Sequence, residues 1–194
     1  MNLNLAHYLI GTRTVGPGFR AVLWTQGCKL RCPGCIAPDW QPFIPAIEKE
    51  PNQFASEILA NPAVSGLTIS GGEPMEQAPG LLILIRALLA RRQINVICFT
   101  GYRLETILQI PPSAEAVELL DTIDVLIDGP YDRNQPGLEG LRGSTNQRFH
   151  YLGSKIAPGS LESWRRNLEV TITPTQASFS GVPLPGLVIP HLSS

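Results

Sequence analysis

The chain has 194 residues, of which 43% are hydrophobic and 16% are charged, and its formal net charge is -1. This length and composition are typical of one soluble globular domain, and the scattered Lys and Arg residues give no electrostatic surface for nucleic acid or anionic lipid. The first residues lack the basic and apolar regions of a signal peptide, and the most apolar stretch, Leu81–Ala90, is interrupted by Arg86. We therefore expect a cytoplasmic protein with neither a nucleic-acid partner nor a membrane partner.

Apolar runs alternate with helical patterns along most of the chain. Runs rich in Val, Ile and Leu predict buried strands at Ala21–Gly27, Leu67–Ser70, Asn95–Thr100 and Thr122–Asp128. Apolar residues at helical spacing predict helices at Gln53–Ala60, Gly80–Arg92, Arg103–Gln109 and Ser113–Leu120. Because strands that alternate with helices form right-handed βαβ units, we expect an α/β fold, a partial (open) β/α barrel with mostly parallel strands.

The end of the chain has a different pattern. Alternating residues at Leu168–Thr173 and Ser178–Gly181 flank a Pro-Thr-Gln turn and predict a C-terminal β-hairpin, and Gly181–Ser194 is a Pro-rich tail. We expect a core domain over residues 1–153 and a C-terminal extension over residues 154–194. In β/α barrels the loops at the carboxyl ends of the strands carry the chemistry, and the motifs described below follow predicted strands.

The first predicted strand is followed by Cys28, Cys32 and Cys35, with the spacing C-x3-C-x2-C. In a reducing cytoplasm such crowding indicates metal binding, since a disulfide would also leave one thiol over. Ferredoxins give each iron of a [4Fe-4S] cluster a thiolate, so that three thiolates leave one iron open. A zinc site, the alternative, needs a fourth ligand nearby, and the histidines lie far away along the sequence. Cys98 lies inside an apolar strand, where we expect a buried core residue.

A second motif, SGGEP, follows the second predicted strand. Gly71 and Gly72 lack a Cβ and so allow a ligand to approach the backbone, and Glu73 offers a carboxylate. A Gly-Gly pair alone is most often a turn, but its place after a strand and downstream of the cysteines predicts a cofactor contact. Thr100 and Asp128 also end predicted strands, where a turn and a surface cap are the simpler interpretations.

Six motifs occur in the order found in one family. They are GPGFR, GCKLRCPGC, SGGEP, FTGY, DVLIDG and RGSTNQR, at Gly16–Arg20, Gly27–Cys35, Ser70–Pro74, Phe99–Tyr102, Asp124–Gly129 and Arg142–Arg148. On these motifs, over roughly residues 5 to 152, the chain resembles the radical S-adenosylmethionine superfamily and, more narrowly, the activating proteins of anaerobic ribonucleotide reductase. Those activators share the CPGC form, whereas the following IAPDW lacks their usual Tyr-Asn or His-Asn.

The resemblance implies a [4Fe-4S] cluster on Cys28, Cys32 and Cys35 and S-adenosyl-L-methionine as the second cofactor. It implies cofactor contacts at Gly34, Ile36, Gly71, Gly72, Glu73, Pro74, Thr100 and Asp128. The family reaction is reductive cleavage of the cofactor to methionine and a 5′-deoxyadenosyl radical, which abstracts a hydrogen atom, while the protein supplies orientation and excludes water. The implied partners are a glycyl-radical enzyme, as the protein substrate, and flavodoxin or ferredoxin, as the electron donor.

Two alternatives remain open on the sequence. The same core, with its altered loop after Cys35 and its longer tail, could modify a peptide or a small molecule. The chain could instead be a non-catalytic iron–sulfur protein that serves electron transfer or sensing. SGGEP argues against this second alternative, because an electron carrier needs no cofactor pocket.

Overall fold

The computed structural model describes residues 1–172 and 177–182, and the turn of the predicted hairpin and most of the Pro-rich tail lie outside them. The strands are β1 Leu3–Thr12, β2 Phe19–Thr25, β3 Ile47–Lys49, β4 Val64–Gly71, β5 Asn95–Thr100, β6 Val125–Asp128, β7 Arg148–Tyr151, β8 Glu169–Ile172 and β9 Ala177–Ser180. The helices are α1 Pro51–Leu59, α2 Ala78–Leu89, α3 Leu104–Gln109 and α4 Ala114–Leu120, with short 3-10 turns η1 Pro38–Trp40 and η2 Pro74–Gln77.

Seven strands form one open sheet in the order β3-β1-β2-β4-β5-β6-β7. The central strands β2, β4, β5 and β6 run parallel to one another, while β1, β3 and β7 pair antiparallel at the two sides. Residues 13–18 alone join β1 to β2, and so short a connection permits only antiparallel pairing. The α/β class, the parallel centre of the sheet and the separate hairpin β8–β9 are confirmed, and the antiparallel sides are additions that the sequence patterns did not predict.

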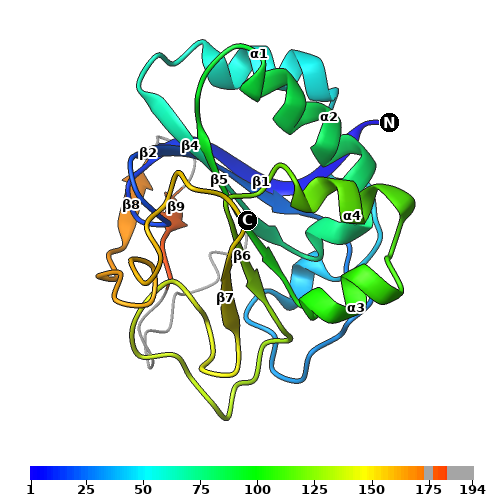
Figure 1. Ribbon diagram of the computed structural model, residues 1–194, viewed down its shortest axis with the longest axis vertical. Coiled ribbons are helices and arrows are strands. Elements are labelled where there is room, and N and C mark those ends of the chain that lie inside the picture. Colours follow the sequence, from blue (N-terminus) through cyan, green and yellow to red (C-terminus); the bar gives the residue numbers. More distant parts are fainter. Residues whose placement is uncertain (173–176, 183–194) are drawn as a thin grey trace.

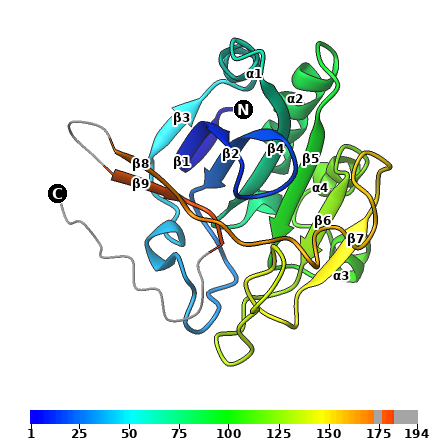
Figure 2. The same ribbon diagram turned by 90° about the vertical axis from the view of Figure 1, so that its left-hand side faces the viewer.

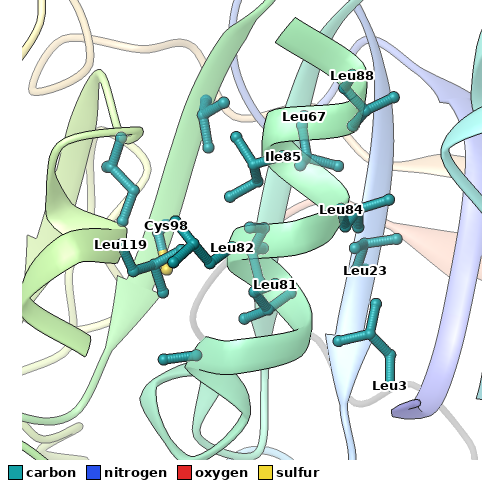
Figure 3. Close-up of a cluster of buried hydrophobic side chains, with 14 of the residues drawn as sticks. Leu3, Leu23, Leu67, Leu81, Leu82, Leu84, Ile85, Leu88, Cys98 and Leu119 are labelled. Atoms are coloured by element: carbon teal, nitrogen blue, oxygen red, sulfur yellow. The ribbon is translucent and has the colours of Figure 1, made fainter. Parts of the chain in front are cut away.

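Helices α1, α2, α3 and α4 lie along one face of the sheet (Figure 1). Alternate strand residues point at these helices, among them Leu23 of β2, Leu67 of β4 and Cys98 of β5. They pack against Leu81 and Leu84 of α2 in a cluster of fully buried side chains (Figure 3). Burying one leucine contributes roughly 1.5–3 kcal/mol, so that this layer holds the helices on the sheet. The expectation that Cys98 is a core residue is confirmed.

The opposite face of the sheet is covered by loops and by the chain that follows β7 (Figure 2). Ile97 of β5 and Ile127 of β6 pack there with Leu141, Ile156 and Leu161 in a second hydrophobic cluster. This cluster combines residues from both sides of position 153, the predicted limit of the core domain. The first part of the C-terminal extension therefore contributes to the hydrophobic core.

The predicted strands and helices agree with the observed ones to within three residues at each end. Local signals explain this agreement. Helix α1, for example, starts at Pro51, and the Glu50 side chain caps it by accepting hydrogen bonds from the N–H groups of Asn52 and Gln53. Within residues 1–172 and 177–182, no helix has the length and apolar character needed to cross a membrane.

The GPGFR motif connects β1 to β2 and is held by the fully buried side chain of Arg20. Its guanidinium donates hydrogen bonds to Oγ1 of Thr68 at 2.6 Å and to the carbonyl oxygens of Pro17 and Leu67 at 2.7 and 2.6 Å. Burial lowers the pKa of Arg20 to about 9, so the side chain stays charged at neutral pH. The motif thus fixes the turn that leads into the first parallel strand.

Candidate active site

A pocket opens at the carboxyl ends of β2, β4 and β5, and side chains from the sheet face opposite the helices line it. Open α/β sheets bind ligands beyond the carboxyl ends of their strands. Nine of the predicted site residues line this pocket, namely Cys28, Cys32, Cys35, Ile36, Gly71, Gly72, Glu73, Pro74 and Thr100. The structure places the two others, Gly34 and Asp128, outside the lining.

The cysteine loop, residues 27–41, leaves the end of β2 and is closed by main-chain hydrogen bonds. The N–H of Gly27 donates to the carbonyl oxygen of Trp40 at 2.8 Å, and the N–H of Cys28 donates to that of Gln41 at 2.9 Å. These two bonds bring the far end of the loop back to its start. The three thiols of the loop line the pocket.

The thiols of Cys28, Cys32 and Cys35 are free and half-buried. Burial raises the pKa of the Cys28 and Cys32 thiols above the ordinary value, so that a bound metal must displace their protons. In the part of the chain that the structure describes, no three Cys, His, Asp or Glu side chains gather around one point as the ligands of a single ion do. A four-iron cluster instead takes each thiolate on a different iron.

The SGGEP motif packs against the end of β2 through its main chain. The N–H of Gly72 donates to the carbonyl oxygen of Thr25 at 2.7 Å, and the N–H of Glu73 donates to that of Gly27 at 2.8 Å. A Cβ on Gly71 would lie 2.3 Å from the backbone nitrogen of Thr25, and one on Gly72 would lie 2.4 Å from the carbonyl oxygen of Gly27. The two glycines therefore permit close contact between backbone segments, and they line the pocket as well.

The Glu73 side chain is fully buried and accepts hydrogen bonds from three groups. The donors are Oγ1 of Thr100 at 2.7 Å, the N–H of Gly101 at 2.8 Å and the N–H of Met75 at 3.0 Å. Burial outweighs these bonds and raises the pKa of Glu73 to about 7. Such a carboxyl group is partly protonated at neutral pH, and a cation in the pocket would hold it ionised.

Asp128 is also buried, but it shares the helix-covered side of the sheet with Leu126, two residues before it. Its carboxylate accepts hydrogen bonds from Nη2 of Arg148 at 2.5 Å and from the N–H of Leu104, the first residue of α3, at 2.7 Å. Burial alone would raise the pKa of Asp128, but the hydrogen bonds from Arg148 and Leu104 hold it below its usual value. Asp128 thus ties the start of α3 to β7.

Gly34 lies before the third cysteine with a φ of 73°, in the left-handed region that favours glycine. A Cβ at this position would lie 2.2 Å from Cδ of Arg133. The glycine of the CPGC form therefore makes room for the Arg133 side chain beside the cysteine loop.

The pocket also contains residues to which the sequence assigned no role. Trp24, near the end of β2, lines it and stacks on His7 with ring centroids 5.4 Å apart. Gln147 of the RGSTNQR motif lines it too, and its side chain accepts from the N–H of Gly143 at 2.8 Å and donates to the carbonyl oxygen of Gly129 at 3.0 Å. The order of the motifs indicates that the RGSTNQR segment matters. Its contact with the pocket depends on the pairing of β7 with β6, which the sequence does not show.

The side chains of the pocket fit an iron–sulfur cluster with S-adenosyl-L-methionine beside it. The loop offers three sulfur ligands, and among the described residues that line the pocket there is no fourth Cys and no His. One iron of a four-iron cluster would therefore stay free for the cofactor. The buried carboxylate of Glu73 offers a charge-assisted partner for an ammonium group.

Comparisons with known proteins agree with this chemistry. A family model described as "4Fe-4S single cluster domain" matches residues 14–150. The anaerobic ribonucleoside-triphosphate reductase-activating protein of Enterobacteria phage T4 is 35% identical over 145 residues, which cover 69% of this chain and 85% of that protein. The protein of the same name from Escherichia coli is 32% identical over 148 residues, covering 71% of this chain and 91% of that protein. The pyruvate formate-lyase-activating enzyme of Staphylococcus epidermidis is 42% identical over 81 residues, covering 39% and 32% of the two chains.

Proposed function

The chain belongs to the radical S-adenosylmethionine family that includes the anaerobic ribonucleoside-triphosphate reductase-activating proteins, and we propose that it generates a glycyl radical on a partner enzyme. The observation that carries this proposal is the composition of one pocket, in which three thiols and a buried carboxylate share the lining. The names of the relatives favour activation of a glycyl-radical enzyme over the modification of a peptide or small molecule and over non-catalytic electron transfer.

Five residues of the pocket have a definite task in this proposal. Cys28, Cys32 and Cys35 hold the [4Fe-4S] cluster, and Glu73 binds the ammonium group of S-adenosyl-L-methionine. Once bound, these two groups supply the electron and the carbon-centred radical that removes a hydrogen atom from the partner. Thr100, by its hydrogen bond of 2.7 Å, fixes the orientation of the Glu73 carboxylate.

The rest of the pocket shields the reaction. Apolar side chains of the sheet, including Val22 and Phe99, line the pocket beside the polar groups. Enclosure of this kind keeps water out and prevents side reactions. Because the hydrogen atom is transferred directly from the partner, no side-chain general base is required.

The finer features of fold and partners are also proposals. We propose that the open sheet is an incomplete β/α barrel whose missing side admits a loop of the partner, a proposal that the four central parallel strands support.

The proposed electron donor is flavodoxin or ferredoxin, and the exposed basic residues Lys29 and Arg31 of the cysteine loop would attract an acidic carrier. The proposed compartment is the reducing cytoplasm, where the thiols of the loop stay free.

The proposal is tested by electron paramagnetic resonance of a candidate partner. Anaerobically reconstituted protein, reduced with dithionite, is incubated with S-adenosyl-L-methionine and a glycyl-radical enzyme encoded beside it. A glycyl signal that disappears when the target glycine of the partner is changed to alanine supports the proposal. A partner that stays free of radical while a peptide or small metabolite is consumed would overturn it.

A further inference from the structure

Residues beyond the family match help to form the pocket. The match ends at residue 150, yet Gly181 and Val182 line the pocket together with the three cysteines. In Figure 2 the hairpin β8–β9 lies beside β1, after a connection that runs from β7. The C-terminal extension thus returns to the pocket from the far end of the chain.

A latch, formed by Thr12, Thr14, Glu169 and Ser180, fastens both strands of the hairpin to the end of β1. The buried hydroxyl of Ser180 lies 2.8 Å from Oγ1 of Thr12 and 3.2 Å from Oγ1 of Thr14. The carboxylate of Glu169 accepts hydrogen bonds from the Thr12 hydroxyl and from the N–H of Arg13, the latter at 3.2 Å. β8 is therefore held through Glu169 and β9 through Ser180.

The segment between β7 and the hairpin holds residues 140–142 by hydrogen bonds, and Leu141 among them lines the pocket. The N–H of Leu141, which lines the pocket, donates to the carbonyl oxygen of Leu161 at 3.1 Å. The guanidinium of Arg166 donates to the carbonyl oxygens of Gly140 and Arg142 at 2.9 and 2.6 Å. The extension therefore contacts the lining residue Leu141. It also contributes two lining residues of its own, Gly181 and Val182.

The direction of the chain after the latch depends on one glycine. Gly181 has a φ of +138°, and a Cβ there would lie 2.3 Å from the carbonyl oxygen of Asn167. The chain bends at this point, directly after Ser180, and Val182 enters the pocket lining. Release of the latch would free the segment that carries Val182.

We propose that residues 154–172 and 177–182 are a positioning element of the site, in which the latch holds Gly181 and Val182 as part of the pocket wall and so keeps stray hydrogen donors out when no partner is bound. This inference rests on the proposed function, because the shielding protects the radical that the proposed reaction forms. It assigns Glu169 and Ser180 as positioning residues, which act through the pocket wall and not on the reacting atoms. The shielding follows from the general rule that a closed site suppresses side reactions.

The first test uses the full chain without its cluster. The double variant Glu169→Ala/Ser180→Ala is compared with Glu169→Gln, whose amide oxygen still accepts hydrogen bonds from Thr12 and Arg13. Amide hydrogen exchange over residues 169–172 and 177–182 is expected to be about tenfold faster in the double variant and unchanged in α2, because local opening exposes only the released segment. Unchanged exchange over residues 169–172 and 177–182 in the double variant would overturn the proposal.

The second test measures 5′-deoxyadenosine made from S-adenosyl-L-methionine by the reconstituted, reduced protein with no partner present. The double variant and Val182→Ala, which trims the wall without touching the latch, are expected to raise this product about tenfold, because an opened wall admits other hydrogen donors to the radical. Glu169→Gln should stay close to the unaltered protein. Equal product in all four proteins, or iron lost from Val182→Ala, would contradict the positioning role. No product from the unaltered protein would contradict the proposed function, while the exchange experiment would still test the latch.

Discussion

The two faces of the central sheet differ in what covers them and in what their side chains can do. On one face, fully buried aliphatic residues of the strands meet four helices in a continuous layer. On the other, the strands end at the cysteine loop, the SGGEP motif and a pocket with a mixed polar and apolar lining. The same parallel strands thus supply stability on one side and chemistry on the other, since successive residues of a strand point to opposite faces.

Two buried carboxylates show the difference in electrostatic terms. Asp128, on the helix side, is paired with Arg148, and this ion pair holds its pKa below the usual value. Glu73, at the pocket, accepts hydrogen bonds from uncharged donors alone among the described residues, and burial raises its pKa to about 7. Burial thus dominates the pKa of Glu73, whereas the hydrogen-bonded ion pair outweighs burial at Asp128.

The largest effect is expected from the cysteines, three of which lie in the loop at the pocket and one on the helix side of the sheet. Replacing Cys28, Cys32 or Cys35 with serine should abolish the iron–sulfur cluster, because each thiolate holds a different iron. Cys98→Ala, on the helix side, should retain it. Iron and sulfide analysis after anaerobic reconstitution measures both outcomes, and full cluster content in any of the three serine variants would break the comparison.

The next effect concerns the aliphatic layer. Leu84→Ala in α2 should lower the free energy of unfolding by roughly 3–5 kcal/mol, because it leaves a cavity in the fully buried cluster. Val182→Ala, a half-buried residue of the pocket wall, should cost less than about 1 kcal/mol. Urea denaturation of the cluster-free protein compares the two, and equal losses would show that the faces contribute alike.

Glu73 should make stability depend on pH in the cluster-free protein. Because its folded pKa is about 7 and its unfolded pKa is ordinary, the contribution of Glu73 is fully present at low pH and is lost as the pH rises through about 7. Glu73→Gln should remove a loss of about 3 kcal/mol between about pH 4 and about pH 8. Glu48→Gln, at an exposed position, is the matched control, and an unchanged pH profile in Glu73→Gln would refute the assignment.

The smallest effect is expected at the outer surface of the helices. Arg86 of α2 and Glu118 of α4 form an ion pair of 2.5 Å with both side chains about half exposed. Exposed pairs of this kind contribute about 0–1 kcal/mol, and salt screens them. Glu118→Gln should therefore change the urea midpoint little, and a loss as large as that of Leu84→Ala would mean that the buried layer is not the dominant contribution.

Much of the fold and site could be predicted because the signals are local. The strand β5 was placed at its observed bounds, Asn95–Thr100, since an unbroken apolar run marks a strand that is buried on both faces. The cysteine loop could be recognised because Cys28, Cys32 and Cys35 lie close together in the sequence. Spacing alone therefore placed the thiols on one loop without tertiary information.

Other features depend on contacts between distant segments, and the sequence does not show them. The sequence pattern does not predict β1, because register shifts at Leu5/His7 and Ile10/Thr12 interrupt the alternation of its side chains between the two faces. Ile156 and Leu161 stand singly among Gly, Pro and Ser residues, so no periodicity marks them as core. The contact between Asp128 and Arg148 likewise joins distant segments, since Arg148 lies 20 residues further along the chain.

The most direct test of the account is the electron paramagnetic resonance spectrum of the reduced cluster, recorded with and without S-adenosyl-L-methionine. An open iron beside Glu73 predicts that the cofactor shifts the spectrum and that the sample then accumulates methionine and 5′-deoxyadenosine. The Glu73→Gln variant should keep its iron but need more cofactor to give the same shift. A reduced cluster whose spectrum stays unchanged and whose cofactor stays intact would contradict the central claim, because the pocket would then hold a cluster without an open iron.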